Sequence, residues 1–134
     1  MKIEEQVLSR EQMAHLVELG VDTSDASMCW IADGEGNSEE DWHVVIPNNF
    51  LMPYKTIPTY TIGDLEEKLP KTLRSETLFS WLVLSTDGCN DPLYSAYYEF
   101  EYGDIVGKQT GDTSIEARYK LLCWVAENHK ELIK

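Results

Sequence analysis

The stretch 113–131, TSIEARYKLLCWVAENHKE, decides how this sequence folds. Its apolar side chains recur at helical spacing, and they cover more of the helix than the single apolar face of an ordinary surface helix. Thr113 and Glu116 are spaced as a capping box, so we predict a helix that begins after Thr113. Such a helix needs cover over most of its circumference, and the face of a β-sheet supplies it.

The stretch 93–102, LYSAYYEFEY, is the natural partner of that helix. Its aromatic residues alternate with polar ones, which is typical of a strand with one buried face. We predict that Tyr98 and Phe100 face the helix and contact Leu121, Leu122 and Val125.

Two further strands extend this sheet. The segment 77–85, TLFSWLVLS, is apolar on both alternating faces, which predicts a central strand covered on two sides. Residues 104–109 have the composition of a short additional strand.

The N-terminal half has its own start and stop signals. Ser9 and Gln12 form a second capping box, and Gly20 provides the left-handed residue that ends a helix, so we predict a helix over about 10–19. Residues 27–33 and 42–46 are predicted to pair as a hairpin across the polar loop between them. Pro53 and Pro58 predict an irregular segment over 48–60.

A short helix is predicted to follow, with Thr61 as its cap and Asp64 at the third position. The predicted order is α-β-β-α-β-β-α in a single domain over residues 1–134. We therefore expect an α+β fold with a mainly antiparallel sheet of about four strands and helices packed on it. The repeated helix–hairpin unit is either an internal duplication or a chance likeness of two short hairpins.

The charge balance excludes several classes of function. The chain has 24 acidic and 11 basic residues and a net charge of −13. Nucleic-acid binding needs clustered lysine and arginine, which the sequence lacks, so direct DNA or RNA binding is disfavoured. Anionic membrane surfaces are disfavoured for the same reason. The acidity either serves solubility or suits a partner with a basic face.

No motif in the sequence indicates a catalytic, cofactor or metal site. The three cysteines, at positions 29, 89 and 123, form no CxxC pair and fit reduced thiols in a cytoplasm. The loop 33–41 alternates acidic residues like a calcium loop, but Ser38 and Val44 stand where glycine and glutamate are required. The N-terminus has no apolar stretch of a signal peptide, so we expect a cytoplasmic protein.

Two segments are candidates for a contact surface. The first is the long connection 48–60, which carries several apolar side chains and either forms a contact surface or folds back over the sheet. The second is an acidic face after the first hairpin loop. The candidate residues are Phe50, Leu51, Met52, Tyr54, Glu39, Glu40, Asp41 and Trp42. A homodimer through 104–109 or 48–60 is left open.

Three stretches of the sequence resemble a known group of proteins. They are REQMAHLVELGVDTSDASMCWI, IPTYTIGDLEEKLPKTL and GDTSIEARYKLLCWVAENHKELI. They resemble small uncharacterised proteins carried by prophages and other mobile elements of gut bacteria. The last stretch is also similar to the closing helix of small phage αβα-sandwich domains and, over one turn and helix, to antitoxins of the HicB type. The resemblance implies a fold family and supplies no catalytic or ligand residues.

Together these observations lead us to expect a non-enzymatic accessory protein of a mobile element that acts through protein–protein contacts. Two alternatives stay open. One is an acidic inhibitor that mimics DNA and blocks a host nuclease or restriction enzyme, which requires acids spaced along one surface. The other is an enzyme whose site is assembled from scattered residues.

Overall fold

The computed structural model describes residues 3–32, 34–47, 55–74, 79–87 and 93–133. They form three α-helices and two antiparallel sheets, which confirms the α+β class. The chain divides into two compact units, Met1–Asp64 and Leu65–Lys134. The prediction that residues 1–134 form one domain stays a prediction, because two compact units can belong to one domain or to two.

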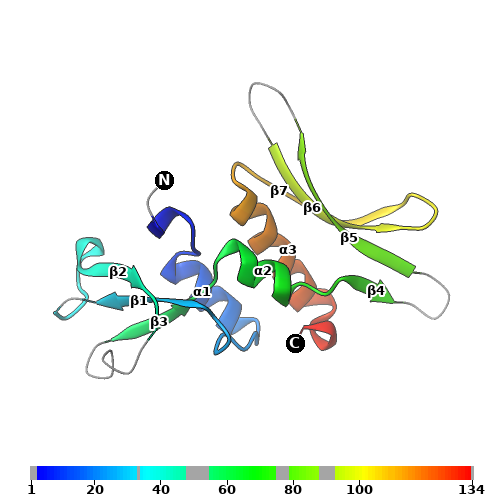
Figure 1. The fold of residues 1–134 in the computed structure, drawn as a ribbon. Coiled ribbons are helices and arrows are strands. Elements are labelled where there is room, and N and C mark those ends of the chain that lie inside the picture. The colour runs from blue at the N-terminus through cyan, green and yellow to red at the C-terminus, as the bar shows by residue number, and fades with distance from the viewer. Residues whose placement is uncertain (1–2, 33, 48–54, 75–78, 88–92, 134) are drawn as a thin grey trace. The chain divides into compact units, whose positions relative to one another are not determined.

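Met1–Asp64 is built on a three-stranded sheet in the order β2-β1-β3 (Figure 1). Strands β1 (Met28–Ala32) and β2 (Trp42–Val45) pair antiparallel, which confirms the predicted hairpin. The third strand, β3 (Thr56–Thr59), lies in the segment that was predicted to be irregular, so that prediction is wrong for these residues. Pro58 is tolerated because β3 is an edge strand.

Helix α1 (Arg10–Glu18) lies against β3 and has both predicted ends. The Gln12 N–H donates to Ser9 Oγ at 3.1 Å, and the Ser9 N–H donates to Gln12 Oε1 at 2.9 Å, so the capping box is present. Gly20 has φ +87° and ends the helix. The 3₁₀ turns η1 (Ile3–Glu5) and η2 (Glu39–Asp41) complete the N-terminal unit. Helix α2 (Ile62–Lys68) follows β3 directly.

Leu65–Lys134 contains the four-stranded sheet β4-β5-β6-β7. Its strands are β4 (Thr72–Arg74), β5 (Phe79–Asp87), β6 (Leu93–Phe100) and β7 (Ile105–Gly111), each antiparallel to its neighbour. β4 was not predicted, and its three residues are too few for a periodic signal. β5 is central as predicted, but Trp81 is 40% exposed, so the second face of this strand is not fully covered.

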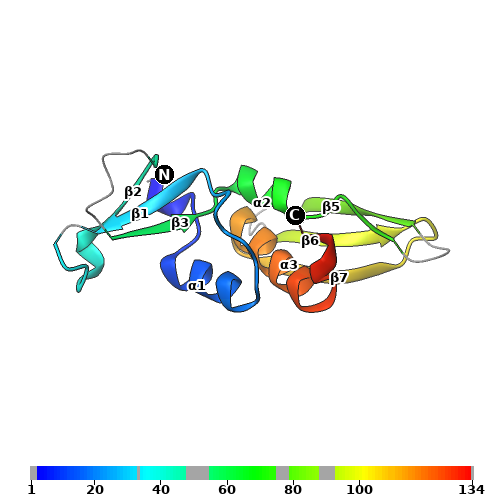
Figure 2. The same ribbon diagram turned by 90° about the horizontal axis from the view of Figure 1, so that it is seen from below.

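Helix α3 (Ser114–Asn128) lies on one face of this sheet, over β6 and β7 (Figure 2). Leu121, Leu122 and Val125 are completely buried, and so is Tyr98 of β6. The Tyr98 and Trp124 rings lie 6.5 Å apart between centroids. The predicted packing of this helix on β6 is therefore confirmed for Tyr98, whereas Phe100 is half-buried and stacks on Tyr102, so its predicted contact with the helix stays a prediction. The short 3₁₀ turn η4 (Lys130–Leu132) follows the helix.

The start of α3 differs from the prediction in one detail. The Glu116 N–H donates to Thr113 Oγ1 at 3.2 Å, as expected of a cap. The Glu116 carboxylate, however, accepts from the Asp112 N–H at 3.3 Å and not from Thr113. Only half of the predicted capping box is present.

A β-bulge in β7 makes room for the helix. The pairing of β6 with β7 shifts between Ala96 and Tyr98, and Gly107 has φ +68°. A Cβ atom at Gly107 would lie only 2.7 Å from the Trp124 ring. This position therefore requires glycine both for its backbone conformation and for the close approach of the helix.

Candidate functional site

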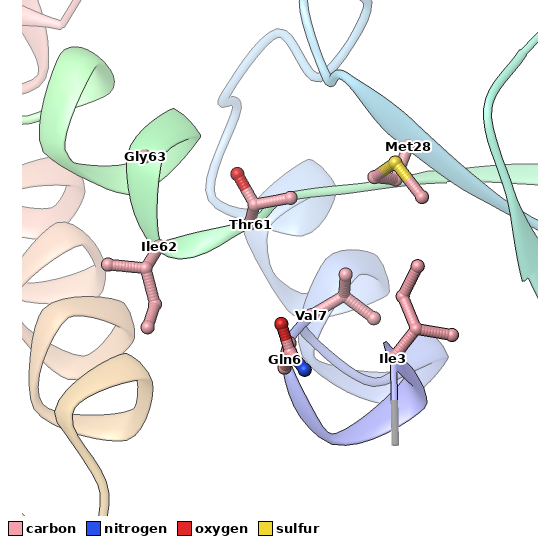
Figure 3. A pocket seen from close by; sticks show the side chains of 7 residues that line it. All are labelled: Ile3, Gln6, Val7, Met28, Thr61, Ile62 and Gly63. Carbon is pink, nitrogen blue, oxygen red and sulfur yellow. The ribbon is translucent and has the colours of Figure 1, made fainter. Parts of the chain in front are cut away.

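A small groove in the N-terminal unit is the candidate binding site (Figure 3). Its volume is about 230 Å³. It lies where the N-terminal turn, the start of β1 and the start of α2 meet. The lining residues are Ile3, Gln6, Val7, Met28, Thr61, Ile62 and Gly63.

The N-terminal wall of the groove is held in place by backbone pairing. Val7 and Thr61 form an isolated antiparallel bridge, and the Leu8 N–H donates to the Tyr60 carbonyl at 3.0 Å. The Gln6 N–H donates to the Ile3 carbonyl at 3.0 Å and closes the turn that carries Ile3. A segment that precedes the first helix thus becomes part of a binding surface.

The opposite wall is organised around one carboxylate. Asp64 Oδ2 accepts from the Ser27 N–H at 3.1 Å, the Ser27 hydroxyl at 2.7 Å and the Thr61 N–H at 3.0 Å. The Asp64 N–H donates in return to Thr61 Oγ1 at 3.1 Å, which completes the predicted cap of α2. Met28, next to Ser27, is therefore fixed relative to Thr61 and Gly63.

A second hydrogen-bonded centre lies behind the groove, at the Leu8 carbonyl. It accepts from Trp30 Nε1 at 2.9 Å and from Thr59 Oγ1 at 2.7 Å. Leu8 and Thr59 are almost completely buried. These two bonds fix the N-terminal segment to β1 and β3, so the groove has a rigid base.

The groove is lined mainly by apolar groups. Val7 forms a buried base with 6% exposure, whereas Ile3 at the rim is 44% exposed. Gln6 and Thr61 contribute the polar side chains, and none of the seven lining residues is ionisable. The volume is below the roughly 300–1,000 Å³ of typical sites for drug-sized ligands.

The predicted acidic face after the first hairpin loop is only partly accessible. Glu39 and Glu40 are exposed in η2, and Asp41 is half-buried. Trp42 is buried, with 9% exposure, and its Nε1 donates to the Gly36 carbonyl at 3.1 Å. The Arg10 guanidinium lies 4.4 Å from the centre of the Trp42 ring and forms an ion pair with Glu39. Trp42 therefore lies beneath this face and is not exposed on it.

The other predicted contact residues cannot be placed. Phe50, Leu51, Met52 and Tyr54 lie outside the described residues.

Basic residues offset fewer of the acidic charges in the N-terminal unit than in the C-terminal unit. Met1–Asp64 contains twelve acidic and three basic residues, a net charge of −9. Leu65–Lys134 contains twelve acidic and eight basic residues, a net charge of −4. In the N-terminal unit Arg10 is paired with Glu39, and Lys55 Nζ donates to the Glu35 carbonyl at 3.0 Å.

The buried thiols are poor nucleophiles. Burial raises the pKa of the Cys29 thiol, and burial is also the largest cause of the raised pKa of Cys123. Both thiols therefore stay protonated near neutral pH, where a nucleophile would have to be a thiolate. Among the residues that the structure describes, no three His, Cys, Asp or Glu side chains are grouped as metal ligands.

Tyr60 is a strongly perturbed ionisable group of the N-terminal unit. Its hydroxyl lies 2.9 Å from the Asp22 carbonyl and 2.8 Å from Asp25 Oδ1. Burial raises its pKa far above the ordinary value, and the hydrogen bond to Asp25 raises it further. The phenol therefore stays protonated near neutral pH, and its hydrogen bonds hold the loop after α1 against Tyr60.

Within the described part of the chain, no helix combines the length and the apolarity that crossing a bilayer requires. Comparisons with protein-family models, with curated proteins and with solved structures found no match.

Sequence reasoning did not identify the groove. The only local signal was the pair Ile3 and Val7, two apolar residues one helical turn apart in an acidic N-terminal stretch. Gln6 lies in the same stretch, but the other four lining residues come from positions 28 and 61–63, and only the fold brings them to the first pair.

Proposed function

We propose that this protein is a non-enzymatic accessory protein that binds a partner protein with a basic face, and that Met1–Asp64 is the binding unit. The observation that carries the proposal is the net charge of −9 on this unit. A field of one sign speeds the encounter with an oppositely charged partner and selects against wrong ones.

The internal pairing of the two described basic residues of this unit supports this assignment. Arg10 and Lys55 are bound to Glu39 and to a backbone carbonyl of the same unit. Glu11, Glu18 and Glu40 are exposed to solvent, which leaves an acidic surface available for a partner. Its role in a prophage or other mobile element rests on the sequence resemblance alone.

The spacing of exposed acids favours a basic protein partner over DNA mimicry. Glu11 and Glu18 lie seven residues apart on one face of α1, which corresponds to about 10 Å along the helix. One strand of B-DNA carries a phosphate about every 3.4 Å of helix axis. His15, between them, lies 3.8 Å from Glu18 and further interrupts the row.

The test compares equal changes of charge in the two units. The variant with Glu11→Gln and Glu40→Gln removes two exposed charges from the N-terminal unit, and Glu67→Gln with Glu101→Gln removes two from the other. Each tagged variant is used to capture proteins from a lysate of gut bacteria, followed by mass spectrometry. We expect one partner that is released by about 0.5 M salt and lost with the first variant only.

Two results of this test would contradict the proposal. A partner retained equally by both variants, or bound independently of salt, contradicts a role for the acidic N-terminal unit. Capture of a nuclease or restriction enzyme, in competition with duplex DNA, would instead support the DNA-mimic alternative.

A further inference from the structure

The groove differs from the acidic surface around it in both shape and chemistry. All seven lining residues are uncharged, and aliphatic or thioether side chains provide most of the walls. Figure 3 shows Ile3, Gln6 and Val7 of the N-terminal segment together, with Met28 and Thr61 above them and Ile62 and Gly63 on α2. A partner that used charge alone would leave this apolar surface in water.

The size of the groove limits what it can hold. About 230 Å³ is less than a typical small-molecule site offers, but it suits one large side chain. Single aromatic or aliphatic side chains that fill such pockets often dominate the energy of protein interfaces. The exposed rim at Ile3 and the buried base at Val7 leave the groove open at the surface and closed at the bottom.

The charges near the groove indicate which residues flank this side chain. Glu5 is exposed in the same turn as Ile3, and Asp64 is half-buried next to Gly63. Among the residues that the structure describes, no lysine or arginine lines the groove. The groove is therefore an uncharged depression in a unit whose net charge is −9.

We infer that the groove receives one aliphatic or aromatic side chain from a short basic segment of the partner protein. This inference rests on the proposed function, because it identifies the part of a basic partner that the N-terminal unit recognises. The flanking lysine or arginine residues provide attraction at a distance, and the anchor side chain provides the contact that decides affinity.

The experiment uses the full chain and four synthetic pentapeptides of defined composition. Two peptides carry leucine or alanine between two pairs of lysines, a third carries phenylalanine there, and a fourth carries leucine between pairs of serines. Affinities are measured by titration of the ¹⁵N-labelled protein, with amide shifts as the readout. We expect the leucine peptide to bind about tenfold more tightly than the alanine peptide, because a filled apolar pocket discriminates at this level. The largest shifts should occur at Val7, Met28 and Gly63.

Two variants and one matched control test the location. Ile3→Ser removes an apolar rim residue, and Ile46→Ser makes the same change at a residue that is 70% exposed at the end of β2 and does not line the groove. Gly63→Leu fills the groove from the start of α2, where an added Cβ meets only Thr61 Oγ1, at 3.7 Å. We expect Ile3→Ser and Gly63→Leu to reduce leucine-peptide binding to the alanine level and Ile46→Ser to leave it unchanged.

The outcomes separate this inference from the proposed function. If lysine peptides bind more tightly than the serine peptide but the central residue has no effect, the groove inference fails and the proposed function stands. If the serine peptide binds as tightly as its lysine counterpart, the basic partner fails and the proposed function with it. Sedimentation measures whether the chain self-associates. If it does, and if Ile3→Ser abolishes this self-association, the occupant of the groove is a second copy of the chain, which would overturn the inference.

Discussion

The two compact units of this chain differ in how their elements are joined. In Leu65–Lys134, an apolar helix covers one face of a four-stranded sheet, and Leu121, Leu122 and Val125 are completely buried. In Met1–Asp64, polar side chains bind backbone carbonyls, such as Trp30 and Thr59 at the Leu8 carbonyl. Both units bury an apolar core, which in Met1–Asp64 includes Leu8, Met13 and Leu16, and these hydrogen bonds add fixed points to the core of the N-terminal unit.

The difference also extends to charge. The N-terminal unit carries −9 and the C-terminal unit −4. Net charge of one sign opposes compaction through self-repulsion. The acidic unit is therefore expected to be the less stable of the two, which is a reason for its short elements to be tied together by specific hydrogen bonds.

The largest expected effect is loss of apolar packing in the C-terminal unit. Leu121→Ala should lower the free energy of unfolding by about 3 kcal/mol, because it removes a fully buried side chain and leaves a cavity. Hydrogen exchange should speed up in β6 more than in β1. Val17→Ala, at a residue that is 57% exposed, is the control. Equal acceleration in β1 and β6 would show that the units unfold together and would remove the distinction between them.

The next effect concerns a hydrogen bond of the N-terminal unit. Tyr60→Phe should cost about 1.5 kcal/mol at pH 7, because the phenol can no longer donate to the Asp22 carbonyl or to Asp25. Urea unfolding measures the loss. Tyr98→Phe is the matched change in the other unit, where the hydroxyl donates to the Pro70 carbonyl at 2.7 Å. Exchange rates should rise in β1 for the first variant and in β6 for the second.

Unfolding at alkaline pH tests how much these two phenols contribute to stability. Burial raises the pKa of Tyr60 and Tyr98 above the ordinary value of 10.0, so the folded state favours the neutral phenol. This contribution is fully present below pH 10 and is lost as the pH rises from there towards the higher folded pKa. Unfolding at pH 7 to 11.5 should show a steeper alkaline loss for the wild type than for Tyr60→Phe. Parallel curves would mean that Tyr60 ionises freely in the folded chain.

A smaller effect distinguishes the two helix caps. Ser9→Ala should cost about 1 kcal/mol and Thr113→Ala somewhat less, because the Ser9 cap has both reciprocal bonds and the Thr113 cap has only one. Thermal unfolding of the two variants measures the difference. A greater loss for Thr113→Ala would mean that the bond between Glu116 and the Asp112 N–H depends on this cap.

The smallest effect is that of salt. Raising sodium chloride from about 0.05 to 0.5 M screens exposed charges and should slow exchange in β1 more than in β6, by a few tenths of a kcal/mol. Choline chloride at the same ionic strength separates screening from specific ion binding. A greater response in β6 would contradict the assignment of the charge repulsion to the N-terminal unit.

Local signals in the sequence were reliable where a few neighbouring residues determine the structure. Ser9 with Gln12, Gly20, and Thr61 with Asp64 all have the roles that their spacing predicts. Each depends on a backbone group within three or four residues, so no distant part of the chain can change it greatly.

Contacts between residues that are distant in the sequence were harder to predict. β3 was missed because Pro58 is read as a break, although an edge strand tolerates it. Trp42 was read as a surface residue because acidic residues precede it, yet Arg10 and Gly36 cover its ring and bind its indole N–H. In both cases the deciding partner is far away in sequence or belongs to another strand.

The sequence by itself determined the α+β class, the caps of the helices and the need of the last helix for a sheet, since propensity, capping and apolar spacing act over short distances. Only the tertiary structure decided the division into two sheets, the burial of Trp42 and the groove formed by Ile3, Val7, Met28 and Gly63. The physical reason is that strand pairing and side-chain packing join positions that are far apart along the chain, and such positions form no periodic pattern in the sequence.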